Sequence, residues 1–339
     1  MRLAEHSVDW RTSTPLTVIG GAPGAGKTTV IRHFLENSAQ CRIVAVVRDV
    51  EPLVAGNRGG TKRRGSVVEW PNGCRAVESD DATATLATLT RDGCAADHVI
   101  VEANGSRNPR RAGGYAYMPG YRPNGMVTIV DSSTAAEFEA HESFTTTIQP
   151  LLQAADLVIL NKLDVAGQEA TAAAQRSISG WAPSARFLWC RVGRIAPALV
   201  VGLVSHDIAL DDARVVAEWR PDYIPVRSER RTMFGEQCRA WCLMSNERAD
   251  ARQFRGWVTR LPTSITRGDG VVFLREEPQH RYEFMLLGSR WSLERGAPWG
   301  NEEPVTRVTL VGLGSRKPEH EASPRASERI VADDLQAVV

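Results

Sequence analysis

The sequence predicts an α/β domain with a mostly parallel sheet, followed by a smaller α+β domain. Three observations support this fold class. The chain has 339 residues, and because a domain usually spans roughly 100 to 200 residues, two domains are expected. Before about Gly202 the apolar runs are short and continuous, which is typical of parallel strands that helices cover on both faces. Amphipathic stretches separate these runs, as an α/β order requires.

Continuous apolar runs are the expected strands of the first domain, and two of the stretches between them are helix candidates. The first candidate follows Thr29 and places its apolar side chains on one helical stripe. The second, Gln168–Ser177, is rich in alanine. In chain order the expected strands are Leu16–Ile19, Ile43–Val47, His98–Val101, Met126–Val130, Leu157–Leu160 and Arg186–Trp189.

After the first domain the pattern weakens into charged residues and prolines, which indicates a linker. Beyond it we expect a strand, a helix and three further strands: Gln237–Met244, Glu247–Arg260, Val271–Leu274, Tyr282–Leu287 and Arg307–Leu313. The expected division is an N-terminal tail over 1–14, a first domain over 15–208, a linker over 209–229, a second domain over 230–315 and a mobile tail over 316–339.

Composition excludes several classes of protein. Lys plus Arg number 41 and Asp plus Glu 40, a formal charge of +1, which argues against a globally basic nucleic-acid binder. No apolar run approaches the roughly 18 residues of a membrane helix, and Met1–Pro15 lacks the apolar core of a secretory signal. Six scattered cysteines form no dense disulfide framework. We therefore expect a reduced, cytoplasmic protein that binds neither membrane nor specific nucleic acid.

A glycine-rich loop is the strongest motif in the chain. Gly21–Thr28 fits G-x-x-x-x-G-K-T, directly after an expected strand and directly before an expected helix, which predicts a P-loop NTPase domain. Its glycines let backbone N–H groups converge on phosphate oxygens at a helix N-terminus. Lys27 would reach the β- and γ-phosphates, and the Thr28 hydroxyl would ligate Mg²⁺. The expected nucleotide-binding residues here are Gly21, Gly24, Ala25, Gly26, Lys27, Thr28 and Thr29.

A second motif, Asn161-Lys162-Leu163-Asp164, closes an apolar strand, so its side chains emerge where ligands bind in open α/β sheets. The carboxylate of Asp164 can accept hydrogen bonds from guanine N1–H and its 2-amino group. Adenine has neither donor there, so GTP is favoured over ATP. Asn161, Lys162 and Asp164 are therefore expected to bind the nucleotide.

Two further strand ends carry carboxylates. Glu102 follows an expected strand, and Asp49 ends another and could face the same ion. Each is a candidate Mg²⁺ ligand, and with Lys27 they are the expected catalytic residues, ordering the ion or the attacking water. Gly105, three residues after Glu102, could offer a backbone N–H to the γ-phosphate. The alternative is that both carboxylates are simply exposed to solvent at the ends of their strands and bind no ion.

Taken together, these motifs and the later α+β domain resemble the CobW-like GTPases, a family in the G-protein group of the urease and hydrogenase nickel-insertion GTPases. The resemblance covers about Leu16 to Ser315. It implies a GTPase that acts as a metallochaperone or metalloenzyme activator, with GTP/GDP and Mg²⁺ as cofactors and a protein client as partner. Related GTPases often dimerise across the nucleotide face, which makes a homodimer one expected arrangement.

The chain departs from the family at its metal motif. The usual N-G-C-x-C-C is replaced by a stretch, 72–77, in which only Cys74 remains. One thiolate cannot by itself hold Zn²⁺ or Co²⁺, and Arg75 adds a repelling charge. Cys74 stays a candidate ligand only with help from another loop or subunit. The remaining cysteines have the surroundings of packing residues: Cys41, Cys94, Cys190, Cys238 and Cys242.

A basic run with glycines, Arg58–Gly65, occupies the region where switch loops usually lie. It is either a solvated loop or a segment that orders against an acidic client or the nucleotide phosphates. The leading hypothesis for the chain is a Mg²⁺-dependent GTPase switch that activates or assembles a client, with the metalloenzyme client implied by the resemblance. The alternatives are a metal-free GTPase that remodels a client and a P-loop kinase for a small molecule.

Overall fold

The computed structural model describes two sheets with associated helices. Gly105, the expected tail 316–339 and most of the expected linker lie outside the described residues. None of the helices described is both long and apolar enough to cross a membrane. The described residues are 13–38, 41–55, 61–103, 113–135, 142–202, 216–218, 221 and 238–313.

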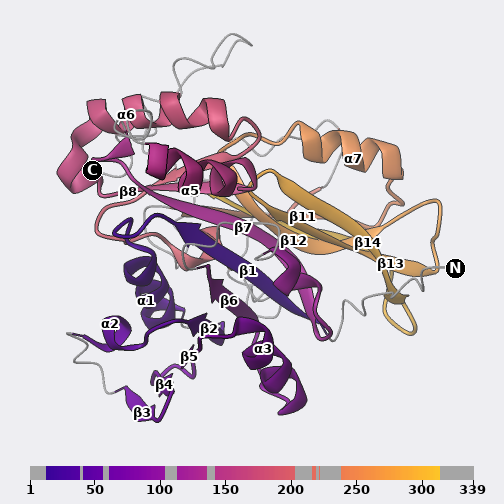
Figure 1. Ribbon diagram of the computed structural model, residues 1–339. Coiled ribbons are helices and arrows are strands. Elements are labelled where there is room, and N and C mark those ends of the chain that lie inside the picture. The colour runs from indigo at the N-terminus through magenta and orange to yellow at the C-terminus, as the bar shows by residue number, and fades with distance from the viewer. Residues whose placement is uncertain are drawn as a thin grey trace, which may run out of the picture.

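Within the described residues the first sheet has nine strands, in the order β3-β4-β5-β2-β6-β1-β7-β8-β9 (Figure 1). From β5 to β9 every neighbouring pair is parallel, whereas the pairs β3–β4 and β4–β5 are antiparallel. The expected mostly parallel sheet is therefore confirmed, with each of the predicted apolar runs in it. The strands are β1 Thr14–Gly21, β2 Ile43–Val47, β3 Lys62–Arg64, β4 Val67–Glu69, β5 Arg75–Glu78, β6 His98–Glu102, β7 Tyr121–Asp131, β8 Leu157–Asn161 and β9 Arg186–Trp189.

The two faces of this sheet are covered by different elements. Helices α3, α5 and α6 pack on one face, while α1 and the short helix η3 pack on the other. Figure 1 shows α1 on the opposite side of β1 and β8 from α5 and α6. The helices are α1 Lys27–Asn37, α2 Glu51–Val54, α3 Ala82–Arg91, α5 Glu142–Gln153 and α6 Leu163–Trp181, and the 3₁₀ turns are η1 Tyr115–Tyr117 and η3 Pro197–Leu199.

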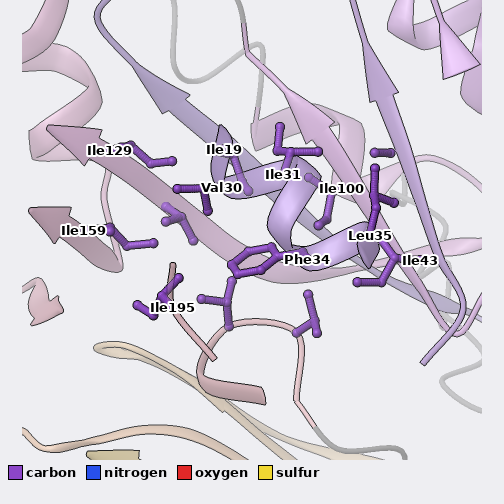
Figure 2. Packing of buried hydrophobic residues seen from close by; sticks show 14 of the residues in the cluster. Ile19, Val30, Ile31, Phe34, Leu35, Ile43, Ile100, Ile129, Ile159 and Ile195 are labelled. Atoms are coloured by element: carbon purple, nitrogen blue, oxygen red, sulfur yellow. The ribbon is translucent and has the colours of Figure 1, made fainter. Parts of the chain in front are cut away.

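Helix α1 is held by its apolar stripe. The stripe expected after Thr29 is fully buried, and each such side chain contributes roughly 1.5–3 kcal/mol by leaving water. Figure 2 shows the stripe packed among isoleucines that come from several strands of the sheet. This packing fixes the position of α1 against the sheet. Its buried apolar residues are Val30, Ile31, Phe34 and Leu35.

The second sheet has six strands among the described residues, in the order β10-β11-β15-β12-β13-β14. All its pairs are antiparallel except β10 with β11, and α7 packs against it (Figure 1). An α+β order was expected and is confirmed. The elements are β10 Val216–Glu218, β11 Cys238–Ser245, α7 Ala251–Thr259, β12 Ile265–Phe273, β13 His280–Leu287, β14 Arg290–Pro298 and β15 Thr306–Leu313.

Some expected bounds were wrong. The helix begins at Ala251 rather than Glu247, because the Asp250 carboxylate accepts the Gln253 N–H at 2.9 Å and caps it. Strand β12 begins well before Val271, since its first half mixes polar residues with glycines and hides the apolar pattern. Strand β14, the edge strand β3 and its neighbours β4 and β5 were not expected, because their half-exposed, charged sequences lack a continuous apolar run.

The turn between β13 and β14 joins the two sheets. Ser289 N–H donates to the Asp156 carbonyl at 3.0 Å. A Cβ at Gly288 would overlap that same carbonyl, and its φ is 55°, so only glycine fits here. Leu287 and Val311 of the second sheet lie in the core of the first. The second sheet is thus packed against the first at the amino-terminal end of β8.

A buried polar chain also crosses between the sheets. His98 Nε2 is paired with the Thr17 hydroxyl at 2.8 Å, and Asn124 Nδ2 donates to that hydroxyl at 2.6 Å. Arg267 of β12 donates to the Asn124 Oδ1 atom and is paired with Asp269. Burial and the charge of Arg267 hold the pKa of His98 well below its usual value, so the imidazole is neutral. Asn124 of β7 is thus hydrogen-bonded both to Thr17 of β1 and to Arg267 of the second sheet, which stabilises one register between the sheets.

Asp156 is a partly buried carboxyl next to the turn that joins the two sheets. Burial raises its pKa to about 6, although the hydrogen bond from the Met126 N–H at 2.8 Å and the charge of Arg290 both act to lower it. Because the folded pKa exceeds the unfolded value of about 3.9, the ionised side chain destabilises the fold above pH 6, and this cost fades as the pH falls toward 4. Asp156→Asn should raise the free energy of unfolding at pH 8 by about 1–2 kcal/mol, allowing for partial exposure.

Urea denaturation of both proteins at pH 8 and pH 4 measures this difference. At pH 4 the two should unfold at nearly the same urea concentration, because the wild-type carboxyl is then protonated in the folded state. An Asp156→Asn protein that is less stable than wild type at pH 8 would contradict the assignment.

Candidate functional site

The P-loop joins β1 to α1 at the carboxyl end of the sheet. Gly24 and Gly26 have φ values of 79° and 98°, which side-chain-bearing residues rarely adopt. A Cβ on Gly26 would collide with the side-chain amide of Asn161, and one on Gly21 with the carbonyl of Ile129. Gly24 instead faces open space. The loop therefore lies tightly against the sheet below and leaves room for a ligand beside Gly24.

Lys27, the first residue of α1, turns its side chain back over this loop. Its Nζ atom donates to the carbonyls of Gly21 and Ala22, each at 3.1 Å, and the residue is 9% exposed. Burial lowers the pKa of Lys27, while the charge of Glu102 acts in the opposite direction. A buried ammonium held mainly by neutral carbonyls is a site that an anion would stabilise.

Of the three expected Mg²⁺ ligands, Thr28 is hydrogen-bonded to Glu102, and the charge of Asp49 acts on the same carboxylate. Register places Glu102 at the end of β6, opposite Ile19 of β1. Burial raises the pKa of Glu102, although Lys27 and a hydrogen bond from the Thr28 hydroxyl act to lower it. The charge of Asp49 raises it further, so this second carboxylate is close enough to interact. Hydroxyl and carboxylate oxygens are the ligands that Mg²⁺ prefers.

Asp49 also has a local structural role. Its Oδ1 atom accepts the Glu51 N–H at 2.9 Å, at the start of α2. The carboxylate of Asp49 is therefore held against the first residue of α2. Any movement of α2 would carry this carboxylate with it.

Asn161 links the two nucleotide motifs directly. Its side chain is buried, and its Nδ2 atom donates to the carbonyl of Ala25 in the P-loop at 3.0 Å. Its Oδ1 atom accepts the Gly193 N–H at 3.0 Å and the Cys190 thiol at 3.1 Å. Both ends of the amide are thus used to hold the P-loop against the segment after β9.

Lys162 and Asp164 lie at the rim of the same sheet edge. Lys162 has φ 63° and its Nζ atom lies 2.6 Å from Asp131 Oδ2. Burial would raise the pKa of Asp131, but hydrogen bonds from Lys162 and Ser133 lower it overall. Asp164 Oδ1 accepts the Val192 N–H at 3.2 Å. The carboxylate of Asp164 keeps acceptor positions for a further ligand, because each carboxylate has about four.

The segment after β9 contacts Asn161 and Asp164 and was not expected from the sequence to lie at this site. Cys190–Arg194 forms a tight turn in which the Arg194 N–H donates to the Arg191 carbonyl at 2.8 Å. Val192 and Gly193 at its centre have φ values of 51° and 69°. Cys190 was expected only to pack, and burial does raise the pKa of its thiol to about 12. A glycine shortly after a strand was the one available signal of this turn.

Thr29 contacts this turn from the P-loop side. A Cβ on Gly193 would lie 2.8 Å from the Thr29 Cγ2 atom, so the turn packs closely on the first turn of α1. Thr29, which was expected to bind the nucleotide, therefore also packs against the turn that contains Gly193.

Cys74 lies away from this site and directly precedes β5 in the chain. It is buried, and its thiol donates to the Cys41 carbonyl at 3.4 Å and accepts the Ile43 N–H at 3.4 Å. Burial raises the pKa of Cys74, which disfavours the thiolate that metals bind. Among the described residues no group of three His, Cys, Asp or Glu side chains is arranged to hold a metal ion.

The described part of the basic run forms the edge strand β3, whose side chains are exposed. Arg63 is paired with Glu51, which begins α2, and lies 3.8 Å from Glu78. Hydrogen bonding to Glu51 raises the pKa of Arg63. The run is thus tied to the segment that contains Asp49, while Lys62 and Arg64 remain exposed.

The chain matches two described families and several characterised proteins. Residues 15–188 match "CobW/HypB/UreG, nucleotide-binding domain" and residues 238–325 match "Cobalamin synthesis protein cobW C-terminal domain". It is 28% identical over 229 residues to "Zinc chaperone CobW" of a Sinorhizobium species, covering 58% of this chain and 65% of that protein. It is 29% identical over 224 residues to "Zinc chaperone CobW" of Pseudomonas aeruginosa, covering 54% and 58%. The matches thus span less than two thirds of the length of these two relatives.

A third relative is matched over more of its length. "Zinc chaperone YjiA" of Escherichia coli K12 is 23% identical over 327 residues, covering 90% of this chain and 95% of that protein. The similarity to it extends over both sheets.

Proposed function

Since the chain belongs to the CobW/HypB/UreG nucleotide-binding family, we propose that it is a Mg²⁺-dependent GTP-binding and hydrolysing switch that activates or assembles a protein client. The observation that carries this proposal is the hydrogen bond between Asn161 Nδ2 and the Ala25 carbonyl. It joins a motif suited to guanine to a loop suited to phosphates, in one rigid site.

The P-loop residues fit a nucleoside triphosphate. The open space beside Gly24 and the buried ammonium of Lys27 support a polyphosphate here, because the ammonium has few charged partners of its own. On binding, Lys27 would exchange its carbonyl partners for phosphate oxygens. Backbone N–H groups at the start of α1 would add further donors, together with the positive end of the helix dipole.

Thr28, Glu102 and Asp49 fit a hard divalent ion. The Thr28 hydroxyl is hydrogen-bonded to Glu102, whose carboxylate also interacts with the charges of Lys27 and Asp49, and Mg²⁺ bound there would neutralise charge that develops on the transferred phosphoryl group. The raised pKa of Glu102 suits a group that orders an attacking water through a hydrogen bond. Lys27 would stabilise the same developing charge from the other side of the loop.

Asp164 supports selection of guanine. Its carboxylate is fixed by the Val192 N–H and retains free acceptor positions at the rim of the site. A guanine edge presents two N–H donors to such a carboxylate, and an adenine edge presents none. This argues against the P-loop kinase alternative, for which ATP is the usual donor.

The nature of the client follows only from the relatives. Those described above are called zinc chaperones, so a metalloenzyme client and zinc cargo are the finer form of the proposal. The buried thiol of Cys74, with its raised pKa, supports instead a switch that carries no metal at this position. The second candidate is therefore a metal-free GTPase that remodels its client.

One titration series tests these proposals. The purified protein with Mg²⁺ should bind GTP more tightly than ATP and release phosphate from GTP. The reduced, metal-free protein is then titrated with Zn²⁺ and with Co²⁺, in the presence of Mg²⁺ and either a GTP analogue or GDP. We expect no stoichiometric binding that depends on Cys74, because ionising its thiol would bury an unpaired charge.

The matched variants are Cys74→Ala and Cys94→Ala, the second at a partly exposed cysteine. Stoichiometric zinc binding that differs between nucleotides and is lost only in Cys74→Ala would favour the metal-carrying form. A protein that binds ATP as well as GTP, or neither, would refute the proposed switch itself.

A further inference from the structure

Helix α7 turns one side toward solvent, and that side is basic. Arg252 and Arg255 of the helix are exposed, and so is Arg248 just before it. Within the described part of the chain, none of the three arginines forms an ion pair with a carboxylate. The whole chain has a formal charge of only +1, so three arginines that lack carboxylate partners are a local excess of positive charge.

Two of these arginines are positioned by aromatic rings of the second sheet. The guanidinium carbon of Arg248 lies 5.6 Å from the centre of the Phe273 ring, and that of Arg255 lies 5.8 Å from the centre of the Trp291 ring. Stacking on a ring orders a long side chain while leaving its N–H groups free to donate. Less rotamer freedom is then lost when an anion binds.

Gly256 lies in the middle of the same exposed side, one turn after Arg252 and next to Arg255. Glycine inside a helix costs about 1 kcal/mol relative to alanine. A Cβ at Gly256 would meet nothing within 4 Å, so no packing inside the chain requires glycine here. The missing side chain lets another backbone approach α7 closely, because the distance between packed helices depends on the side chains at their contact.

The charges around α7 favour a protein partner over a nucleic acid. At the start of the helix the carboxylates of Asp250 and Glu276 accept the N–H groups of Gln253 and Ala251. They place negative charge at one end of the basic side, which would repel the continuous charge of a phosphate backbone. A protein segment can instead place its carboxylates opposite the arginines alone, where each guanidinium can pair with both oxygens of a carboxylate.

We propose that the exposed side of α7, formed by Arg248, Arg252, Arg255 and Gly256, docks an acidic helical segment of a partner protein. The carboxylates of that segment pair with the arginines, and its backbone lies against Gly256. Figure 1 shows α7 at the opposite end of the molecule from α1. The docking surface is therefore separate from the proposed nucleotide site, and a failure of GTP binding would leave this inference standing.

An alanine-based helical peptide that carries four glutamates is the probe for this surface. Its fluorescence anisotropy is measured with the whole chain at low salt, in excess Mg²⁺·GDP, and we expect saturable binding. A double variant, Arg252→Gln with Arg255→Gln, should bind the peptide about tenfold more weakly. Gly256→Gln should also weaken binding several-fold, because its side chain fills the gap, yet it should raise the Tm, since glutamine is the better helix former.

The matched controls lie on other helices. Arg91→Gln with Arg176→Gln removes the same charge from exposed arginines of α3 and α6, and Gly180→Gln replaces an exposed glycine of α6 whose Cβ would also meet nothing within 4 Å. Both controls should bind the peptide like the wild type. Equal weakening in the two arginine pairs would reduce the effect to net charge and overturn the docking surface.

Three other results would also overturn it. The first is the absence of any peptide binding, and the second is wild-type binding in a folded Gly256→Gln protein. The third is tighter binding of a single-stranded oligonucleotide with the same charge, lost in the double arginine variant, which would assign this side of α7 to nucleic acid. A peptide that carries four lysines in place of the glutamates should not bind.

Discussion

Lys27→Ala should lose nucleotide binding by about a hundredfold or more. The ammonium is buried beside the P-loop, where each charge-assisted hydrogen bond to a phosphate oxygen contributes about 1.5–3 kcal/mol, and at least two would be lost. Hydrolysis should fall below detection at nucleotide concentrations that saturate the wild type. Fluorescent GDP titration and phosphate release measure the two effects.

Lys62→Ala is the control for this prediction. It makes the same substitution at an exposed lysine of β3, and it should leave GDP affinity within about twofold, since exposed charges are screened by solvent. Circular dichroism and the Tm check that each variant is folded. Equal losses in both variants would mean that net charge, rather than the position of Lys27, governs binding. Unchanged binding in a folded Lys27→Ala protein would refute the phosphate site.

Asp164→Asn should change which base the protein prefers. The variant keeps an oxygen that can accept the Val192 N–H, but its amide nitrogen would face the guanine 2-amino group, donor against donor. GTP affinity should fall by about a hundredfold, because buried polar groups would be left unpaired. Xanthosine triphosphate carries a carbonyl in place of the 2-amino group, so its affinity should rise above that of GTP.

Competition of GTP, ATP and xanthosine triphosphate against a fluorescent nucleotide tests this change of preference. Asp81→Asn is the matched control, because Asp81 caps α3 away from the site and asparagine can still accept the same N–H groups. That variant should keep the wild-type preference. If Asp164→Asn also keeps it, Asp164 does not recognise the base.

The predicted strands and motifs owe their success to local physical signals. A strand buried on both faces must be continuously apolar, so runs such as Ile43–Val47 stand out without any knowledge of their neighbours. The P-loop signal is equally local, because the glycines, the lysine and the start of α1 all lie within the short segment Gly21–Thr28. Strand β14 escaped prediction because polar and charged residues interrupt its few apolar residues at a sheet edge.

The grouping of Thr28, Glu102 and Asp49 was predictable to a lesser degree. Each ends or follows an expected strand, and the carboxyl ends of parallel strands meet at one edge of a sheet. Sequence could not say which strands are neighbours. The order β2-β6-β1 decides this: it places Glu102 of β6 next to β1, and Asp49, after β2, one strand further away.

The sequence alone determined that this chain is an α/β protein with a phosphate-binding loop, a guanine-type motif and a following α+β domain. Only the tertiary structure decided that Asn161 bridges two loops, that Cys74 is a buried thiol, and that the turn after β9 contacts Asp164. The physical reason is distance along the chain. Asn161 and Ala25 are separated by 136 residues, so their hydrogen bond depends on sheet order and packing, which no local pattern of residues encodes.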